Sequence, residues 1–259
     1  MLKLSVIGLK GGVGKTSVTL GLAGAATLRG LATLVVDLDP QGNASSILAP
    51  ANLDATVADV LANPTRANLE AALSPCEWEI GPGEVDVLPA TPELVSFDAY
   101  KADSFRPRLA KVASSFDGYD LVLFDLPPSH GSLVREALAV SDAAVIVTTP
   151  SFFGGQGVDR AVETIREMQR TLNPGLKFAG IIVNRVRTVV EEHAYRQGEL
   201  EAVHGKHAVL APVIPERAAV QQAESHGVPV QTIQTSGARE IREIFEQHLT
   251  HLLKIAPKK

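Results

Sequence analysis

The sequence predicts an α/β fold in which a mostly parallel, twisted sheet is covered by helices on both faces. Three observations predict it. Short apolar runs alternate with stretches of helical periodicity, a glycine-rich loop joins the first run to the first helix, and several runs end in acidic or amide side chains. Alternating strands and helices favour parallel strands joined by right-handed crossovers. Ligands of such sheets bind beyond the carboxyl ends of the strands.

Composition sets the frame for this fold. The chain has 259 residues, of which 45% are hydrophobic and 20% are charged, so we expect one domain spanning residues 1–259. The single cysteine, Cys76, cannot form an internal disulfide, and no apolar run reaches the roughly 18 residues of a membrane span. The chain starts directly in its first predicted strand, so we expect no secretory signal and a cytoplasmic protein. With a net charge of −5, contact with nucleic acid would have to come from a local basic patch or from assembly of a dimer.

A phosphate-binding loop is predicted between the first strand, at residues 4–8, and the first helix, at residues 17–29. The loop reads KGGVGKTS from Lys10 to Ser17. Its glycines let backbone N–H groups turn inward, and the helix N-terminus adds partial positive charge. We expect Lys15 to reach the β- and γ-phosphates and the Thr16 hydroxyl to ligate Mg²⁺. The predicted ATP-binding residues of this loop are Gly11, Gly12, Val13, Gly14, Lys15, Thr16 and Ser17.

Two further apolar runs end in acidic residues. The run at residues 32–37 leads into Asp37 and Asp39, and the run at residues 119–125 ends in Asp125. Carboxylates beside bound phosphate can order a Mg²⁺ shell and orient a water molecule. On its own, the Asp37 segment would be read as a turn with a helix cap. Beside the lysine loop, we assign Asp37 and Asp125 to the metal.

The remaining elements complete the α/β pattern. Strands are predicted at residues 85–89, 143–150 and 178–183, and a loop with three glycines at residues 151–157. Apolar residues at helical spacing predict helices at residues 56–62, 104–116, 158–172 and 236–253.

The phosphate loop departs from the ordinary pattern G-x-x-x-x-G-K-[ST]. Leu9 stands where that pattern has glycine, and Lys10 adds a second lysine. With DLDPQGN from Asp37 and DLPPS from Asp125, the chain resembles the ParA/MinD family of ATPases. The resemblance implies a P-loop NTPase domain and Mg²⁺-dependent, intrinsically slow ATP hydrolysis. Asp39 would position the attacking water, and Lys10 would cross a dimer interface to touch the partner's ATP.

The same resemblance assigns the base-binding residues. Asn184, at the end of the strand at residues 178–183, would face the adenine. The loop VIPER, at residues 213–217, would flank the base and contribute Pro215 and Arg217. The catalytic residues implied are Lys10, Lys15 and Asp39.

A partition-type ATPase closest to ParA of the Soj type is the function that the resemblance implies. An ATP homodimer would bind DNA non-specifically at the nucleoid, and a ParB-type adaptor would stimulate hydrolysis while a chromosome, plasmid or other cargo is positioned. The candidate DNA contacts, at predicted loop or helix-start positions, are Arg185, Arg187, Arg196 and Arg217. However, Glu216 and Ala219 stand where the family often has basic residues, and a solvated mixed-charge face is the alternative.

Three other functions stay open. A membrane-associated regulator of the MinD type would need a basic amphipathic tail, and Pro257 interrupts the tail here, so membrane binding is not expected. A bacterial tyrosine kinase would need a tyrosine-rich tail, which the chain lacks. A nucleotide-switched scaffold with negligible turnover is the third. A redox ATPase holding an iron–sulfur cluster is excluded, because it needs two cysteines per chain.

Overall fold

Side chains alternate between the two faces of one central sheet in the computed structural model, which describes residues 1–78, 80–99 and 105–257. Along β5 (Leu121–Asp125), Leu123 packs into the core on one face and Phe124 into the core on the other. Because β5 is buried along its whole length, its sequence reads as a continuous apolar run rather than an alternating one. The sheet therefore has a hydrophobic core on each face, as predicted.

The described residues form seven strands in the order β3-β4-β2-β5-β1-β6-β7. Every neighbouring pair is parallel except β3–β4, which is antiparallel. The strand bounds are β1 Leu2–Ile7, β2 Thr33–Asp37, β3 Ser74–Pro75, β4 Val85–Leu88, β5 Leu121–Asp125, β6 Ala143–Thr148 and β7 Lys177–Val183. Apart from β3, each lies within a residue or two of its predicted range. The predicted mostly parallel sheet is confirmed.

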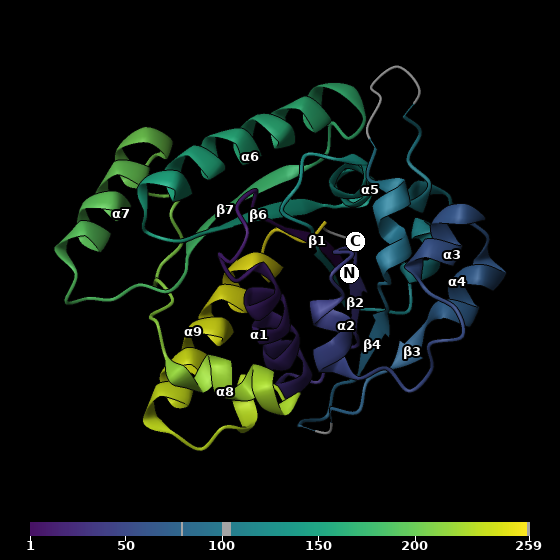
Figure 1. The fold of residues 1–259 in the computed structure, drawn as a ribbon, viewed down its shortest axis with the longest axis horizontal. Coiled ribbons are helices and arrows are strands. Elements are labelled where there is room, and N and C mark those ends of the chain that lie inside the picture. Colours follow the sequence, from purple (N-terminus) through teal and green to yellow (C-terminus); the bar gives the residue numbers. More distant parts are fainter. Residues whose placement is uncertain (79, 100–104, 258–259) are drawn as a thin grey trace.

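One face of the sheet is covered by α1, α8 and α9 (Figure 1). The helices near this face are α1 Lys15–Leu28, α2 Asn43–Leu48, α8 Ala218–His226 and α9 Ser236–Leu253. Helices α1 and α9 approach so closely that a Cβ added to Gly21 would lie 2.2 Å from the Phe245 ring. The small residues of α1 are therefore explained by packing, and α1 presents its N-terminus to the end of β1.

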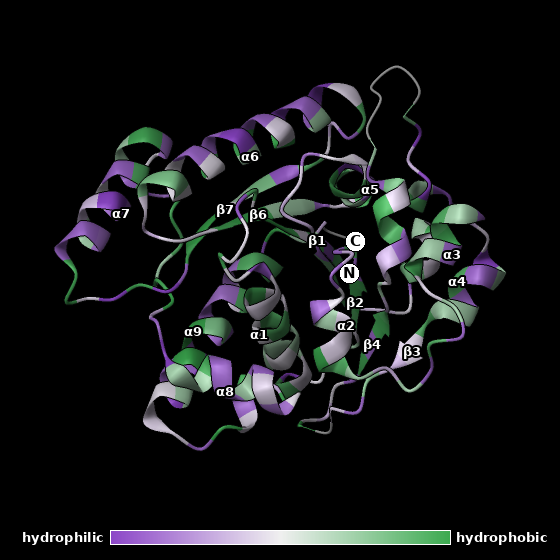
Figure 2. Ribbon diagram, in the orientation of Figure 1, coloured by the Kyte–Doolittle hydropathy of each residue, from purple (hydrophilic) through white to green (hydrophobic). Residues whose placement is uncertain are grey.

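The other face carries α3, α4, α5 and α6 (Figure 1), with bounds α3 Val57–Ala62, α4 Arg66–Ala72, α5 Ser132–Val140 and α6 Phe152–Thr171. Helix α7 (Glu191–His204) lies beside α6 at the edge of the molecule. Figure 2 shows polar residues spread over α6 and α7, while α1 is mainly apolar. Among the described helices, none is long and apolar enough to cross a membrane.

Two predicted elements are wrong in part. The predicted loop at residues 151–157 is helical, because α6 begins at Phe152 and the Ser151 side chain caps it at the Gly154 N–H. The helix predicted at residues 104–116 is instead two short 3₁₀ helices, Leu109–Lys111 and Ala113–Phe116, while Ser104 lies outside the described residues. The predicted apolar face remains, since Leu109, Val112 and Phe116 are buried.

Candidate functional site

The glycine-rich loop lies at the carboxyl ends of the strands, between β1 and α1. Gly12 has φ 75° and Gly14 has φ 91°, a left-handed backbone that other residues rarely adopt. Gly14 is also the N-cap of α1, so the first free N–H groups of the helix follow directly. Gly11, Gly12, Lys15 and Thr16 line a cavity of about 520 Å³. This geometry is an anion-binding nest at a helix N-terminus.

Lys15 is the buried cation of this cavity. Its residue is 7% exposed, and burial lowers the pKa of its ammonium group, while Asp125 and Asp39 act in the opposite direction. A desolvated ammonium group beside free N–H donors is placed to neutralise a phosphate. The structure thus brings the predicted phosphate-binding lysine to the cavity.

Asp37 and Asp125 lie side by side at the strand ends, as register partners of β2 and β5. Asp125 Oδ2 accepts a hydrogen bond from Thr16 Oγ1 at 2.7 Å. Asp37 Oδ2 accepts from both the backbone N–H and the hydroxyl of Ser45, at 2.8 and 2.7 Å. Burial, and then repulsion from Asp37, raise the pKa of Asp125 to about 7. Burial raises the pKa of Asp37 to about 6.

These residues fit a magnesium ion. Two buried carboxylates repel each other, and a divalent cation nearby would relieve that repulsion. Hard cations prefer oxygen ligands, and Mg²⁺ is usually held by one or two protein oxygens together with substrate phosphates. Thr16 offers such an oxygen on the cavity wall, and Asp125 lies buried directly behind it, joined to the Thr16 hydroxyl, with Asp37 as its neighbour. A larger protein cage is not present, since the described residues hold no group of three or more metal-ligating side chains.

Asp39 occupies the cavity wall at the start of the loop after β2. Its N–H donates to Asp37 Oδ1 at 3.1 Å, and its own Oδ1 accepts from the Gln41 N–H at 3.0 Å. Asp39 and Gln41 both line the cavity. The carboxylate is therefore held by its own turn and is free to accept a hydrogen bond from a water molecule in the cavity.

Asn184 and Arg185 follow β7 and contact the glycine-rich loop from the side. Asn184 Nδ2 donates to the Val13 carbonyl at 2.8 Å, and Arg185 Nη1 donates to the Gly12 carbonyl at 2.9 Å. Arg185 also lines the cavity, although the sequence had placed it on a DNA surface. The prediction that Asn184 faces an adenine stays a prediction. Its amide is engaged with the loop in this structure.

Glu224 of α8 also lines the cavity, and sequence reasoning missed it. The Ser17 hydroxyl donates to Glu224 Oε1 at 2.5 Å, which joins α8 to the first turn of α1. Pro215 and Arg217 are not on the cavity wall. Pro215 is buried, and Arg217 makes two hydrogen bonds to the Glu240 carboxylate, at 2.8 and 3.1 Å.

Three of the four arginines predicted to touch DNA are paired with glutamates. Arg187 lies 3.6 Å from Glu216, and Arg217 pairs with Glu240. Arg196 lies in the second turn of α7 rather than at its start, and glutamates at positions 192 and 199 pair with it at 2.7 Å. Each of these four ion pairs includes at least one exposed side chain. Ala219, the second position where the family often has a basic residue, is 5% exposed and packs from α8 into the core.

Lys10 is not among the residues that line the cavity beside Lys15. Its Nζ lies 3.4 Å from Ser151 Oγ and 5.9 Å from the centre of the Phe153 ring. Both contacts are with the start of α6, where Phe153 is 65% exposed. The two lysines of the loop therefore lie in different environments.

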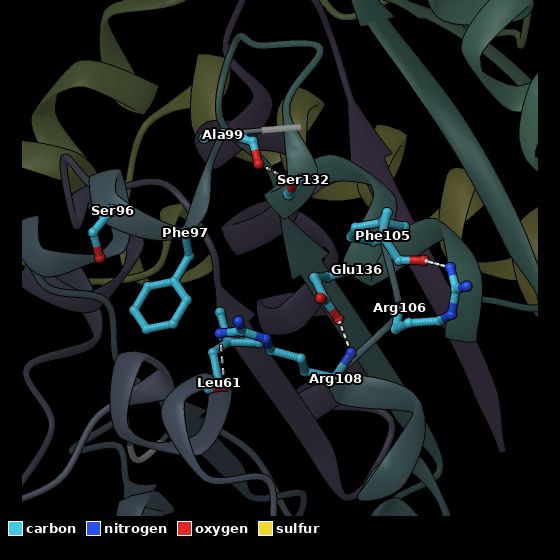
Figure 3. A pocket seen from close by; sticks show the side chains of 9 residues that line it. All are labelled: Leu61, Ser96, Phe97, Ala99, Phe105, Arg106, Arg108, Ser132 and Glu136. Carbon is cyan, nitrogen blue, oxygen red and sulfur yellow. Dashed lines mark hydrogen bonds between the residues drawn. The ribbon is translucent and has the colours of Figure 1, made fainter. Parts of the chain in front are cut away.

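A second cavity, of about 350 Å³, lies between α3 and α5 and holds none of the phosphate-loop residues (Figure 3). Glu136 accepts the backbone N–H groups of Arg108 and Leu109 there, at 2.6 and 2.9 Å. The Arg108 guanidinium donates to the Leu61 carbonyl and stacks on Phe97. These polar groups serve the protein itself, so the chemistry is assigned to the loop cavity.

Comparisons with known proteins agree with this geometry. A family model described as an AAA domain matches residues 1–178. The chain is 33% identical over 249 residues to the chromosome-partitioning ATPase Soj of Thermus thermophilus, across 95% of this chain and 94% of that protein. It is 31% identical over 249 residues to the Soj protein of Treponema pallidum, across 94% and 95%.

A solved structure, the cell division ATPase MinD of Pyrococcus furiosus, is similar along the whole chain. The TM-score is 0.76 with 25% sequence identity, covering 99% of this chain and 100% of that one. The phosphate loop with its second lysine, the paired aspartates at the strand ends and the full-length similarity to Soj agree with one another. The chain therefore belongs to the ParA/MinD family of ATPases, and the reaction of its loop cavity is the hydrolysis of ATP.

Proposed function

We propose that this chain is an ATP-driven partition or positioning ATPase that works as a nucleotide-dependent dimer. Two ATP molecules would be enclosed between two subunits, the dimer would bind DNA non-specifically, and an adaptor of the ParB type would stimulate hydrolysis and release. The protein would act in the cytoplasm, at the nucleoid. The observation that carries the proposal is the placement of Lys10.

Lys10 and Lys15 sit five residues apart in one loop but face different surroundings. Lys15 is buried at its own cavity, whereas Lys10 is partly exposed and held by Ser151 Oγ at 3.4 Å. A lysine that does not serve its own phosphate site is available to another subunit. Because its contacts with Ser151 and Phe153 are a long hydrogen bond and a cation–π contact at a largely exposed ring, releasing it costs about 1 kcal/mol.

Hydrolysis in this proposal is in-line attack of water on the γ-phosphate. Phosphoryl transfer needs positioning and charge neutralisation more than covalent chemistry. Lys15 and the loop N–H groups neutralise phosphate oxygens, and Asp39 orients the water. Magnesium, held by Thr16 and Asp125 with Asp37 nearby, supplies further charge neutralisation when it is bound with ATP. Asn184 and Pro215, with Arg217, would flank the base after ATP enters.

DNA binding by the dimer would require a basic surface. Arg187, Arg196 and Arg217 would have to exchange glutamate partners for phosphates. Exposed ion pairs are worth about 0–1 kcal/mol, so Arg187 and Arg217 can exchange their partners at little cost. Arg196 is held more firmly, because its side chain is 21% exposed and pairs with two glutamates. The net charge of −5 opposes DNA binding by a monomer. A dimer presents the same arginines twice on one particle, which raises its affinity for DNA.

The dimer is tested by light scattering on an exclusion column, with MgATP, MgADP and no nucleotide. Asp39→Ala, which should slow hydrolysis, holds the ATP state during the run. We expect a dimer with ATP, and a monomer with ADP. Lys10→Ala in the Asp39→Ala background should remain monomeric, while its ATP affinity stays within about threefold. A dimer of normal strength without Lys10 would overturn the intersubunit role.

DNA binding is tested by retardation of random-sequence DNA with ATP, ADP and a non-hydrolysable analogue across a salt series. Retardation only with triphosphate, falling steeply with salt, supports phosphate contact by the dimer. Absence of retardation in every state would contradict the DNA part. Sedimentation with anionic liposomes then tests the MinD-type alternative. Lack of phosphate release with any partner would favour the nucleotide-switched scaffold.

A further inference from the structure

Asn184 and Arg185 hold two consecutive carbonyl groups of the phosphate loop. We infer that this pair is a clamp which orients the phosphate-binding N–H groups before nucleotide arrives, and that Arg185 is a positioning residue for nucleotide binding. This role goes beyond the family motifs and is separate from the DNA contact that the sequence suggested for Arg185.

The clamp consists of four hydrogen bonds in series. The Asn184 N–H donates to the Thr148 carbonyl at 2.8 Å, which ties the dipeptide to the end of β6. Asn184 Nδ2 then donates to the Val13 carbonyl at 2.8 Å. The Arg185 N–H donates to Asn184 Oδ1 at 2.9 Å, and Arg185 Nη1 donates to the Gly12 carbonyl at 2.9 Å. The loop is thereby attached to the sheet through side chains about 170 residues away in sequence.

Holding these carbonyls fixes the neighbouring N–H groups. A trans peptide is planar, and its C=O and N–H point in opposite directions. Fixing the Gly12 carbonyl therefore fixes the direction of the Val13 N–H, and fixing the Val13 carbonyl fixes that of the Gly14 N–H. These are the N–H groups of the glycine turn that precedes the helix N-terminus, where a phosphate nest is built.

The backbone at the clamp is closely fitted. Arg185 has φ 57°, a left-handed conformation that costs a non-glycine residue free energy and persists where the surroundings demand it. On the other side, a Cβ added to Gly14 would lie 2.2 Å from Asn184 Nδ2. The left-handed turn directs Arg185 back over the loop, whereas Arg187, two residues later, pairs with Glu216 instead.

A clamp that acts before nucleotide binding has a specific kinetic signature. It favours the bound ground state and the transition state equally, so its loss raises KM and leaves kcat nearly unchanged. A residue that touches the γ-phosphate only in the transition state would lower kcat instead. Because the clamp acts on N–H groups of the loop, its loss should weaken ADP as well as ATP.

The experiment measures ADP affinity by titration with a fluorescent ADP, and steady-state ATP hydrolysis, for three variants of Arg185. Arg185→Ala should bind ADP about tenfold more weakly, the effect of one charged hydrogen bond. Arg185→Lys keeps a donor and should recover part of that loss. Arg185→Gly removes the side chain but relieves the left-handed backbone, so it should lose ADP affinity while its melting temperature without nucleotide stays equal or rises.

Arg170→Ala is the matched control, because Arg170 is an exposed arginine of α6 with one glutamate partner, Glu163, at 3.0 Å. It should leave ADP affinity and turnover unchanged. A fall in kcat at unchanged ADP affinity for Arg185→Ala would overturn the clamp in favour of a transition-state contact. Unchanged affinity and turnover in all three variants would remove Arg185 from the nucleotide site altogether.

Discussion

Thr16 and Asp125 are joined by a hydrogen bond of 2.7 Å, from Thr16 Oγ1 to Asp125 Oδ2. The Thr19 hydroxyl donates to the other oxygen, Oδ1, at 3.1 Å. Since the Thr16 hydroxyl donates its hydrogen bond to Asp125, the lone pairs of Thr16 Oγ1 stay available to a cation. Asp125 thus orients the threonine, and the two candidate metal ligands act as a unit.

The affinity for magnesium should depend on pH near neutrality. Burial raises the pKa of Asp125 to about 7 and that of Asp37 to about 6, so both carboxyls are largely protonated below pH 6. Cations need the ionised form, and Mg²⁺ affinity should rise between pH 6 and 8. The measurement is the Mg²⁺ concentration that half-saturates ATP hydrolysis at several pH values. An equal half-saturating Mg²⁺ concentration at pH 6 and pH 8 would contradict the raised pKa values of Asp37 and Asp125.

The same carboxyls should make the magnesium-free protein less stable as pH rises. Asp125 has a higher pKa in the folded state than its ordinary 3.8, so the native state binds more protons between about pH 4 and pH 7. Stability falls with pH wherever the native state binds more protons. Asp125 alone should lower the free energy of unfolding by about 2–3 kcal/mol between pH 5 and pH 8, which is measured as the difference between the unmodified protein and Asp125→Asn in urea melts with chelator.

Asp125→Asn is the control for this loss, and its stability should vary less with pH than that of the unmodified protein. Buried His248 has its pKa lowered to about 4, which acts in the opposite direction, because stability rises as pH passes from that value to the ordinary 6.5. Its contribution cancels in the difference between the two proteins. If stability varied with pH identically in the unmodified protein and in Asp125→Asn, Asp125 would not be the source of the loss.

Residues that end an apolar strand were predictable, and residues that reach the loop from elsewhere were not. Asp37 and Asp125 each close a buried strand, and the carboxyl ends of parallel strands meet at one edge of the sheet. Glu224, by contrast, meets Ser17 across 207 positions of sequence. Helical periodicity says which face of α8 is apolar, but it does not say which polar side chain reaches the cavity.

The errors of the sequence analysis also have local causes. Three glycines at residues 151–157 suggested a loop, yet Gly154 is required inside α6, where a Cβ would lie 2.2 Å from the Thr149 carbonyl. Close approach of the backbone, rather than helix propensity, explains that glycine. Arg185 is exposed, as its prediction as a DNA contact requires, and that contact stays a prediction. Its hydrogen bond to the Gly12 carbonyl was missed, because a left-handed backbone cannot be seen in an apolar strand followed by Asn-Arg.

Gly14→Ala should damage both folding and binding. The residue has φ 91°, and its new Cβ would lie 2.2 Å from Asn184 Nδ2, which carries the clamp on Val13. We expect a loss of about 2–3 kcal/mol in the free energy of unfolding, together with loss of ADP binding. Gly118→Ala is the comparison, since nothing lies within 4 Å of its Cβ position. Equal stability of the two variants would show that the loop relaxes freely.

Asp39→Asn should separate binding from hydrolysis. The amide keeps the size of the side chain and an oxygen for the Gln41 N–H, but it removes the charge that would attract a proton of the attacking water. We expect kcat to fall about 100-fold or more, while ATP affinity stays within about twofold. Single-turnover hydrolysis and equilibrium binding supply the two numbers. An equal loss of kcat and of ATP affinity would show instead that Asp39 helps to hold the nucleotide.

Glu216→Gln should tighten DNA binding by the ATP state if the arginines near α8 face DNA. Glu216 lies 3.6 Å from Arg187, and both side chains are about half exposed, at 49% and 59%. Releasing Arg187 for a phosphate should make the salt dependence of log K steeper by about one unit, with affinity two- to threefold higher at low salt. Glu163→Gln on α6 releases Arg170 from a pair of similar exposure and carries the same change in net charge. If both variants gain equally, net charge rather than the Arg187 position explains the effect, and the DNA surface lies elsewhere.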